Sequence, residues 1–248
     1  MYNNSDAHNF IHQLSIDCVI FGYRDRQLKV LVSKLNFEGE FYTLPGGFIL
    51  HNEDIDLAAR RILNERTALS DLYLQQFYVF GQAGRNNKEV LDQLIKLNPK
   101  MQLEEIASKK SYDWLTKRFI SVGYYALVDI TKFTPRKTAL DESIAWYDIS
   151  SLPPLIMDHR EIVEKALETL RREMDEKITA FNLLPDTFTM KEVQKLYETV
   201  HDRPFVRTNF QKKILDLQVL ERIGKKYTGA ANKAPYLYRF KNAHFKAH

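Results

Sequence analysis

The sequence predicts an α/β domain followed by a smaller helical domain that ends in a β-hairpin. Residues 14–148 contain apolar runs typical of strands around a segment of helical period. Residues 158–240 carry three helix-start signals, followed by two short runs rich in β-branched and aromatic residues. The chain has 248 residues, 44% hydrophobic and 27% charged, which is enough for one large domain or two smaller ones.

The first strands are predicted as a hairpin, 14–22 and 27–34, followed by a short strand that ends in a Pro-Gly-Gly turn at 45–47. A helix comes next, because apolar side chains recur at i, i+3, i+4 and i+7. These side chains are Ile55, Ala58, Ala59 and Ile62. Further strands are expected at 75–80, 119–130 and 144–148.

Two segments interrupt and end this first domain. Residues 86–117 are polar and mostly helix-prone, and they are predicted to form an insertion on the surface. A connecting helix begins at Asp158, with Glu161 three residues on, as in a capping box. Its apolar stripe contains Ile162, Val163, Ala166, Leu167, Leu170 and Met174. The expected boundaries are 1–157 for the first domain, 158–180 for the connecting helix and 181–248 for the second domain.

The second domain shows the order of elements of a winged helix. Thr189 with Glu192, and Thr208 with Gln211, frame two more capping boxes. The helices that they start are separated by a Pro-containing turn, which predicts a helix-turn-helix. The apolar face of the second helix is expected at Val206, Phe210, Ile214 and Leu217. Residues 219–223 and 236–240 then read as paired strands around a basic loop.

The charge distribution differs between the two parts of the chain. Residues 181–248 contain 13 Lys and Arg against 6 Asp and Glu, whereas residues 1–180 contain 23 and 26. A basic domain on a mildly acidic body is typical of a module that binds a polyanion.

We therefore expect the second domain to bind double-stranded DNA. The second helix is predicted to enter a major groove, with Arg207 and Asn209 near base edges. Lysines on that helix and on the wing are expected near phosphates. The complete set of expected DNA-binding residues is Arg207, Thr208, Asn209, Lys212, Lys213, Lys225, Lys226, Tyr227 and Lys233.

The composition also excludes several classes. One cysteine excludes a disulfide scaffold and a cysteine-built zinc site, and Cys18 lies in an apolar run typical of a buried core thiol. The first ten residues do not have the pattern of a secretion signal. No apolar run approaches the roughly 20 residues that a membrane span needs. We expect a cytoplasmic protein without a membrane partner.

Residues 47–69 resemble the Nudix box, whose pattern is G-x5-E-x7-R-E-U-x-E-E-x-G-U, where U is a bulky aliphatic residue. The matches are Gly47, Glu53, Arg61, Leu63, Glu65 and Leu69. The departures are Ile62 and Arg66, where the pattern has glutamates, and Ala68, where it has glycine.

These departures bear on catalysis. The resemblance implies Mg²⁺ held by carboxylates on one helix face beside a pyrophosphate. Two of the three helix carboxylates are absent, and Arg66 adds a positive charge. We therefore expect no catalytic residues, no metal site and no cofactor. The alternative is an active Nudix hydrolase, with Glu53 recruited as a ligand and a tail that binds RNA or a nucleotide substrate.

The carboxyl-terminal part carries the more specific resemblance. The segments 183–189, 196–198, 209–215 and 237–240 resemble transcriptional regulators of the NrtR type, and the chain is most similar to their arabinose-utilisation branch (AraR). The resemblance implies a Nudix-like α/β/α sandwich followed by a winged helix-turn-helix domain. It also implies a homodimer on a palindromic operator, acting as a repressor in carbohydrate metabolism.

The effector is expected to bind in the Nudix-like domain. The resemblance favours L-arabinose, with ADP-ribose second, because the 86–117 insertion replaces a short link of the NAD-related branch. A neutral sugar needs carboxylates and amides for its hydroxyls and an aromatic ring for its apolar face. The candidates are Asp17, Lys34, Tyr42, His51, Glu53, Arg61, Glu65 and Arg85. A third interpretation is a protein-interaction module without affinity for duplex DNA.

Overall fold

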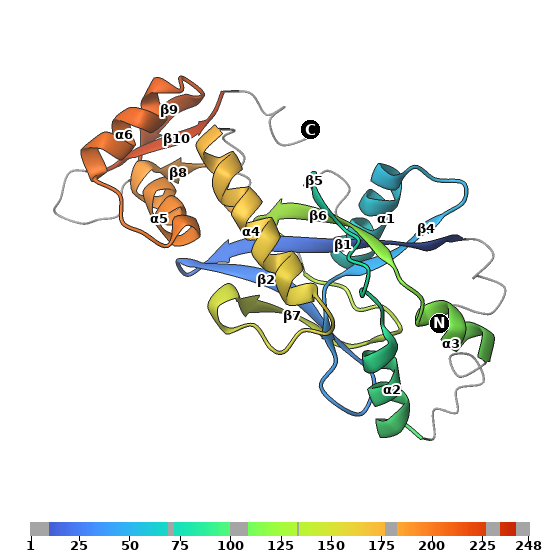
Figure 1. Ribbon diagram of the computed structural model, residues 1–248. Helices are drawn as coiled ribbons and strands as arrows, with labels where there is room; N and C mark the ends of the chain where they lie inside the picture. Colours follow the sequence, from blue (N-terminus) through green and yellow to red (C-terminus); the bar gives the residue numbers. More distant parts are fainter. Residues whose placement is uncertain are drawn as a thin grey trace.

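Within the described residues, a mixed sheet of seven strands forms the centre of the first domain (Figure 1). The computed structural model describes residues 10–68, 72–99, 109–132, 134–176, 183–226 and 234–241. The strands are β1 (Phe10–Arg24), β2 (Gln27–Leu35), β3 (Tyr42–Thr43), β4 (Gly46–Leu50), β5 (Tyr73–Phe80), β6 (Ile120–Val128) and β7 (Asp141–Asp148). The order is β3-β2-β1-β6-β5, with β4 also paired to β1 and β7 to β2. Strands β1 and β6 run parallel, whereas β1 and β2 form the predicted antiparallel hairpin.

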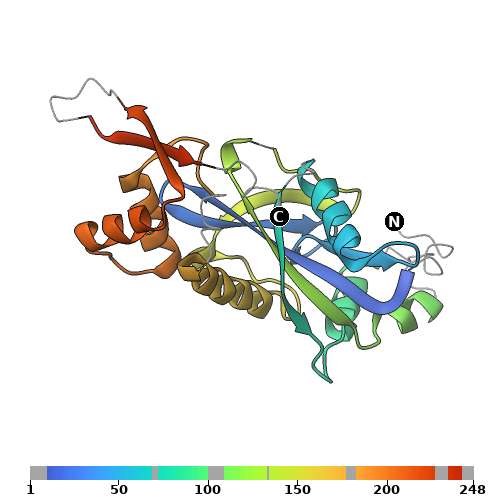
Figure 2. The same ribbon diagram turned by 90° about the horizontal axis from the view of Figure 1, so that it is seen from above.

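Helices cover both faces of this sheet, so the domain is an α/β/α sandwich (Figure 2). Side chains of β1 alternate between two hydrophobic cores: Val19 and Phe21 face one, and Cys18 and Ile20 face the other. Helix α4 (His159–Glu176) packs on the first face and α1 (Ile55–Thr67) on the second. The predicted core thiol is confirmed, because Cys18 is fully buried and its burial raises the pKa of the thiol.

The apolar stripe of α1 begins one turn later than expected. Ala58, Ala59 and Ile62 are buried as predicted, but Ile55 is 39% exposed at the first position of the helix. Leu63 is buried instead and extends the contact with the sheet. The first turn contacts the sheet through a polar group instead, the carboxylate of Asp56, which accepts a hydrogen bond from the Tyr124 hydroxyl of β6.

The predicted Pro-Gly-Gly turn at 45–47 is partly wrong, because Gly46 and Gly47 belong to β4 and pair with Asp17 and Ile16 of β1. A β-carbon at Gly46 would lie 2.7 Å from the Ile16 carbonyl oxygen. Glycine is therefore required by the close approach of two backbones.

The segment 86–117 contains two helices, α2 (Lys88–Leu97) and α3 (Lys109–Leu115), with residues 100–108 outside the described part. A bridge between Asn86 and Arg118 closes its base. Two single-turn 3₁₀ helices, η2 (Ile130–Lys132) and η3 (Ile149–Ser151), follow β6 and β7.

The carboxyl-terminal module has the winged-helix order. It contains β8 (Phe188–Thr189), α5 (Met190–His201), α6 (Arg207–Asp216), β9 (Leu220–Lys225) and β10 (Tyr236–Phe240). Its described strands form a sheet in the order β8-β10-β9. Side chains of α4, α5 and α6 belong to the same hydrophobic cluster as one face of the large sheet.

One capping box of this module is confirmed and one is wrong. Thr189 accepts a hydrogen bond from the Glu192 backbone, and the Glu192 side chain accepts one from the Thr189 backbone. Helix α6 instead begins at Arg207 after Val206, with no side-chain cap, so Thr208 lies inside the helix. Its buried face is also narrower than predicted, since only Phe210 and Ile214 are buried. Val206 is 67% exposed and Leu217 is 40% exposed.

None of the helices in the described part of the chain is long and apolar enough to cross a membrane.

Candidate functional site

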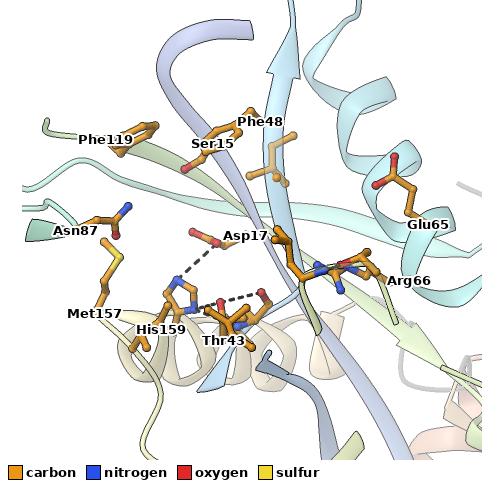
Figure 3. Close-up of a pocket in the computed structure, with 18 of the residues that line it drawn as sticks. Ser15, Asp17, Thr43, Phe48, Glu65, Arg66, Asn87, Phe119, Met157 and His159 are labelled. Atoms are coloured by element: carbon orange, nitrogen blue, oxygen red, sulfur yellow. Dashed lines mark hydrogen bonds and ion pairs between the residues drawn. The ribbon is translucent and has the colours of Figure 1, made fainter. Parts of the chain in front are cut away.

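A cavity of about 380 Å³ opens where β1, β4, the last turn of α1 and the first residue of α4 meet (Figure 3). Its lining is drawn from segments that are far apart in the sequence. The polar residues of the lining are Ser15, Asp17, Thr43, Glu65, Arg66, Arg85, Asn87, Thr138 and His159. The volume lies at the lower end of the range typical of small-molecule sites.

A buried charge network forms the floor of this cavity. The Arg85 guanidinium donates to Asp17 Oδ2 at 3.2 Å and, with two nitrogens, to Asp158 at 2.7 and 3.1 Å. Ser121 Oγ donates to Asp17 Oδ2 at 2.5 Å. Asp17 and Arg85 are 7% and 8% exposed, and burial at this level requires the pairing that both groups have.

His159, the first residue of α4, lies beside Asp17 at the floor of the cavity, and a dashed line joins the two side chains in Figure 3. Its Nδ1 accepts a hydrogen bond from the Leu44 backbone N–H at 3.0 Å, and Thr43 Oγ1 lies 3.3 Å away. Burial lowers the pKa of His159. Because Nδ1 accepts, the neutral ring carries its proton on Nε2, which lies 3.7 Å from Asp17 Oδ1.

Aromatic rings form the opposite wall. Phe48 and Phe119 line the cavity with ring centroids 5.7 Å apart. Trp114 of α3 packs edge-on against both, at 4.8 and 5.4 Å. Asn87, at the start of the 86–117 segment, also lines the cavity. The predicted insertion therefore supports the cavity wall in addition to covering the domain surface.

The structure brings three of the eight predicted effector residues together in this lining: Asp17, Glu65 and Arg85. The other five lie outside it. Lys34 pairs with Glu142 at 2.7 Å, which raises the pKa of the lysine. Tyr42 packs edge-on against Tyr147, and His51 is exposed in the turn before α1. Glu53 and Arg61 bind each other.

Sequence reasoning missed His159, Asp158, Ser15 and Thr43. Asp158 was interpreted as a helix cap, but its carboxylate binds Arg85. His159 gave no periodic signal, because its role depends on β1 and on the turn at Thr43–Leu44. The signal that could have indicated a site is the polar pair Asp158 and His159, which follows a loop and begins a helix with an apolar stripe.

The Nudix-box positions do not fit Mg²⁺. Both Glu53 oxygens accept hydrogen bonds from Arg61, at 2.6 and 3.0 Å, and this pairing lowers the pKa of Glu53. Ile62 is buried in the core, and the Arg66 guanidinium donates to the buried Asp141. Within the described residues, no group of three or more His, Cys, Asp or Glu side chains is arranged to hold a metal ion. Leu69 of the box lies outside the described part.

The winged-helix module presents a basic surface. Arg207, Thr208, Asn209, Lys212 and Lys213 are all exposed on α6. Lys225 and Lys226 are exposed at the end of β9, where Lys226 also pairs with Glu192 at 3.0 Å. The predicted DNA-binding residues Tyr227 and Lys233 lie outside the described residues.

Comparison with known proteins gives the family of the winged-helix module. Residues 180–240 match the family model of the NrtR DNA-binding winged helix domain. Over 92% of its length the chain is 24% identical to a curated protein of Acinetobacter baylyi, the ADPR responsive transcriptional repressor NtrR, of which it covers 81%.

Two solved structures share the whole architecture. Shewanella oneidensis NrtR complexed with a 27mer DNA is 23% identical, with a TM-score of 0.66 over 93% of this chain and 94% of that one. A MutT/nudix family protein from Enterococcus faecalis is 19% identical, with a TM-score of 0.67 over 93% and 87%. The chain therefore consists of a Nudix-like domain followed by a carboxyl-terminal winged helix domain of the NrtR type.

Proposed function

We propose that the protein is a ligand-responsive transcriptional repressor that binds duplex DNA through its winged helix. The observation that carries the proposal is the match of residues 180–240 to a DNA-binding domain family, combined with the exposed basic face of α6. A homodimer on a palindromic operator agrees with this geometry, since one short recognition helix reads few base pairs.

The salt dependence of DNA affinity tests this role. Replacing both Lys212 and Lys213 with alanine removes two exposed cations from each protomer, and the slope of log affinity against log salt should fall in magnitude by roughly 4 for a bound homodimer. The matched control replaces Lys88 and Arg60, two exposed cations outside the module, and should leave the slope unchanged. If the salt dependence of DNA affinity had the same slope in both double variants, DNA binding through α6 would be contradicted, and the module would be interpreted as a protein-interaction domain.

We propose further that the cavity binds a neutral sugar, with L-arabinose as the first compound to test. Arg85 and Arg66 are each paired with carboxylates, and Glu65 of the lining is paired with Arg61 at 3.2 Å. A pyrophosphate would have to displace one of those carboxylates from its arginine, and removing the charged pyrophosphate from water would cost free energy. A sugar needs no such exchange, and Phe48 and Phe119 provide an apolar surface for its ring.

The second candidate effector is ADP-ribose, which the name of the Acinetobacter baylyi relative supports. The two effectors predict opposite results in one titration calorimetry experiment on the full chain. The sugar proposal expects heat with L-arabinose and none with ADP-ribose, while heat with ADP-ribose alone would overturn it.

We also propose that the Nudix-like domain has no hydrolase activity. Glu53 is paired with Arg61, and Arg66 is paired with Asp141. Among the described residues, no cluster of carboxylates is then left to bind a hard cation. Incubation with Mg²⁺ and ADP-ribose should release no monophosphate beyond the buffer control. Sustained release that depends on Glu53 would restore the hydrolase alternative.

A further inference from the structure

Two polar atoms at the floor of the cavity face each other without a hydrogen bond. The hydrogen bonds that Asp17 accepts from Ser121 and Arg85 both end at Oδ2. Its Oδ1 lies 3.7 Å from His159 Nε2, which is beyond hydrogen-bond range. Among the described residues, neither atom has another hydrogen-bond partner, although both residues are more than nine-tenths buried.

The chemistry of this pair selects one kind of group. Asp17 Oδ1 accepts hydrogen bonds only, and the protonated His159 Nε2 donates only. An oxygen about 2.8 Å from both atoms can contact them from one side, because their 3.7 Å separation leaves no room for an oxygen directly between them. A hydroxyl group can donate to the carboxylate and accept from the imidazole at once. A carboxylate or phosphate oxygen would be repelled by Asp17, and an ammonium group could not accept from His159.

The same pair lies at the start of the helix that reaches the DNA-binding module. His159 is the first residue of α4, and Asp158, just before it, binds Arg85. Near the other end of α4, the Met174 carbonyl accepts a hydrogen bond from Tyr197 of α5 at 3.1 Å. Arg171 of α4 donates to the Val200 carbonyl of α5 at 2.6 Å. A helix of 18 residues spans about 27 Å, so it connects the cavity with the module directly.

We propose that a hydroxyl group of the effector bridges Asp17 Oδ1 and His159 Nε2, and that this bridge sets the position of α4 and of the winged helix. This inference rests on the proposed function and adds a specific contact between the effector and the cavity. The part of the effector at this contact is then a hydroxyl group, and His159 is a residue that both binds the effector and transmits its binding.

The variant His159→Asn separates the bridge from the fold. An asparagine oxygen can still accept from the Leu44 backbone, as Nδ1 does, but the Nε2 donor is lost. Calorimetry with L-arabinose on the full-length variant should give about 10- to 100-fold weaker binding than the wild type. The matched control His12→Asn, at an exposed position of β1, should bind the sugar as the wild type does.

The outcomes distinguish this inference from the proposed function. Wild-type protein that binds operator DNA and the sugar, with His159→Asn binding the sugar equally well, would overturn the bridge and leave the regulator standing. Wild-type protein that fails to bind duplex DNA would overturn the proposed function. Circular dichroism of each variant checks that the fold is retained.

A second variant tests transmission through α4. Arg171→Ala removes the hydrogen bond from α4 to the Val200 carbonyl of α5 and lies outside the cavity lining. It should bind L-arabinose within a few-fold of the wild type, while the sugar-induced change in operator affinity becomes smaller. Because coupling between two sites is reciprocal, DNA should then also have less effect on sugar affinity. An unchanged sugar effect on DNA would exclude α4 as the connection.

Discussion

Arg66 illustrates how a single side chain changes the chemistry of the Nudix-like helix. Its guanidinium occupies a position where the Nudix pattern has a glutamate, and it donates to Asp141, whose side chain is fully buried. Asp141 also accepts from the Thr138 backbone N–H at 2.6 Å. The sequence indicated the loss of a metal ligand at position 66. It could not indicate the partner, because Asp141 lies 75 residues further along the chain.

Gly46 makes a residue-scale prediction about the cavity. A β-carbon there would lie 2.7 Å from the Ile16 carbonyl oxygen and 2.9 Å from Asp17 Oδ1. Gly46→Ala should therefore lower the free energy of unfolding by about 1–3 kcal/mol in urea titrations. Gly84→Ala, where no described atom lies within 4 Å, is the control and should change it by less than about 0.5 kcal/mol. Equal effects at both positions would contradict the close approach of β4 to β1.

The pH dependence of stability reports on His159. Burial, opposed by Asp17 and Asp158 and reinforced by Arg85, lowers its pKa from the ordinary value of 6.5. Below pH 6.5 the unfolded chain binds a proton at His159 that the folded chain does not bind. The contribution of neutral His159 to the free energy of unfolding is therefore fully present above pH 6.5 and decreases as the pH falls below that value.

Melting temperatures measured from pH 8 to pH 5 check this dependence. The decrease should be smaller in His159→Asn than in the wild type. Each 1 kcal/mol corresponds to about 2–4 °C for a chain of this size. Parallel curves for the two proteins would mean that the pKa of His159 is the same in the folded and the unfolded chain, which would contradict its lowered pKa.

At the scale of elements, the apolar periodicity of the sequence predicted which strands and helices form more accurately than it predicted the residue at which each begins. The hairpin of β1 and β2 and the helices α1, α4, α5 and α6 all follow apolar patterns in the sequence. Helix starts depend on which contacts the cap residue finds in three dimensions. Thr189 reaches its own helix, whereas the carboxylate of Asp158 binds Arg85 of a distant loop.

The two threonines of the winged helix give a prediction for the capping signals. Thr189→Ala removes the cap of α5 and should cost about 1 kcal/mol of unfolding free energy. Thr208→Ala removes an exposed side chain inside α6 and should change the stability by less than about 0.5 kcal/mol. Urea unfolding of both variants measures the difference. A larger loss at Thr208 would place the start of α6 at the position that the sequence suggested.

At the scale of the whole molecule, the hydrophobic core continues from one domain into the next. Ile162 and Leu170 of α4 belong to the cluster that also contains Val193 and Phe210 of the winged helix. The boundaries at 157 and 180 therefore remain a proposal for how the chain divides, with α4 contributing to both parts. A shared core allows a change at the cavity to alter the position of the module.

The fold was largely predictable from the sequence, but the cavity was not. Alternation and helical stripes are local signals, and they placed the sheet, its covering helices and the winged helix. The cavity instead combines β1, a turn, the inserted segment and the start of α4, and no local pattern connects these. Asp17 and Arg85 were among the polar residues that the sequence offered for the hydroxyls of a sugar, whereas His159 required its three-dimensional neighbours.

The central claim is that the Nudix-like cavity controls DNA binding by the winged helix. The most direct measurement is a gel-shift titration of the full-length protein on the upstream region of its own operon, with L-arabinose, with ADP-ribose and with neither. We expect a salt-sensitive complex that L-arabinose dissociates and ADP-ribose leaves intact. A complex that neither compound changes, or the absence of any complex, would contradict it.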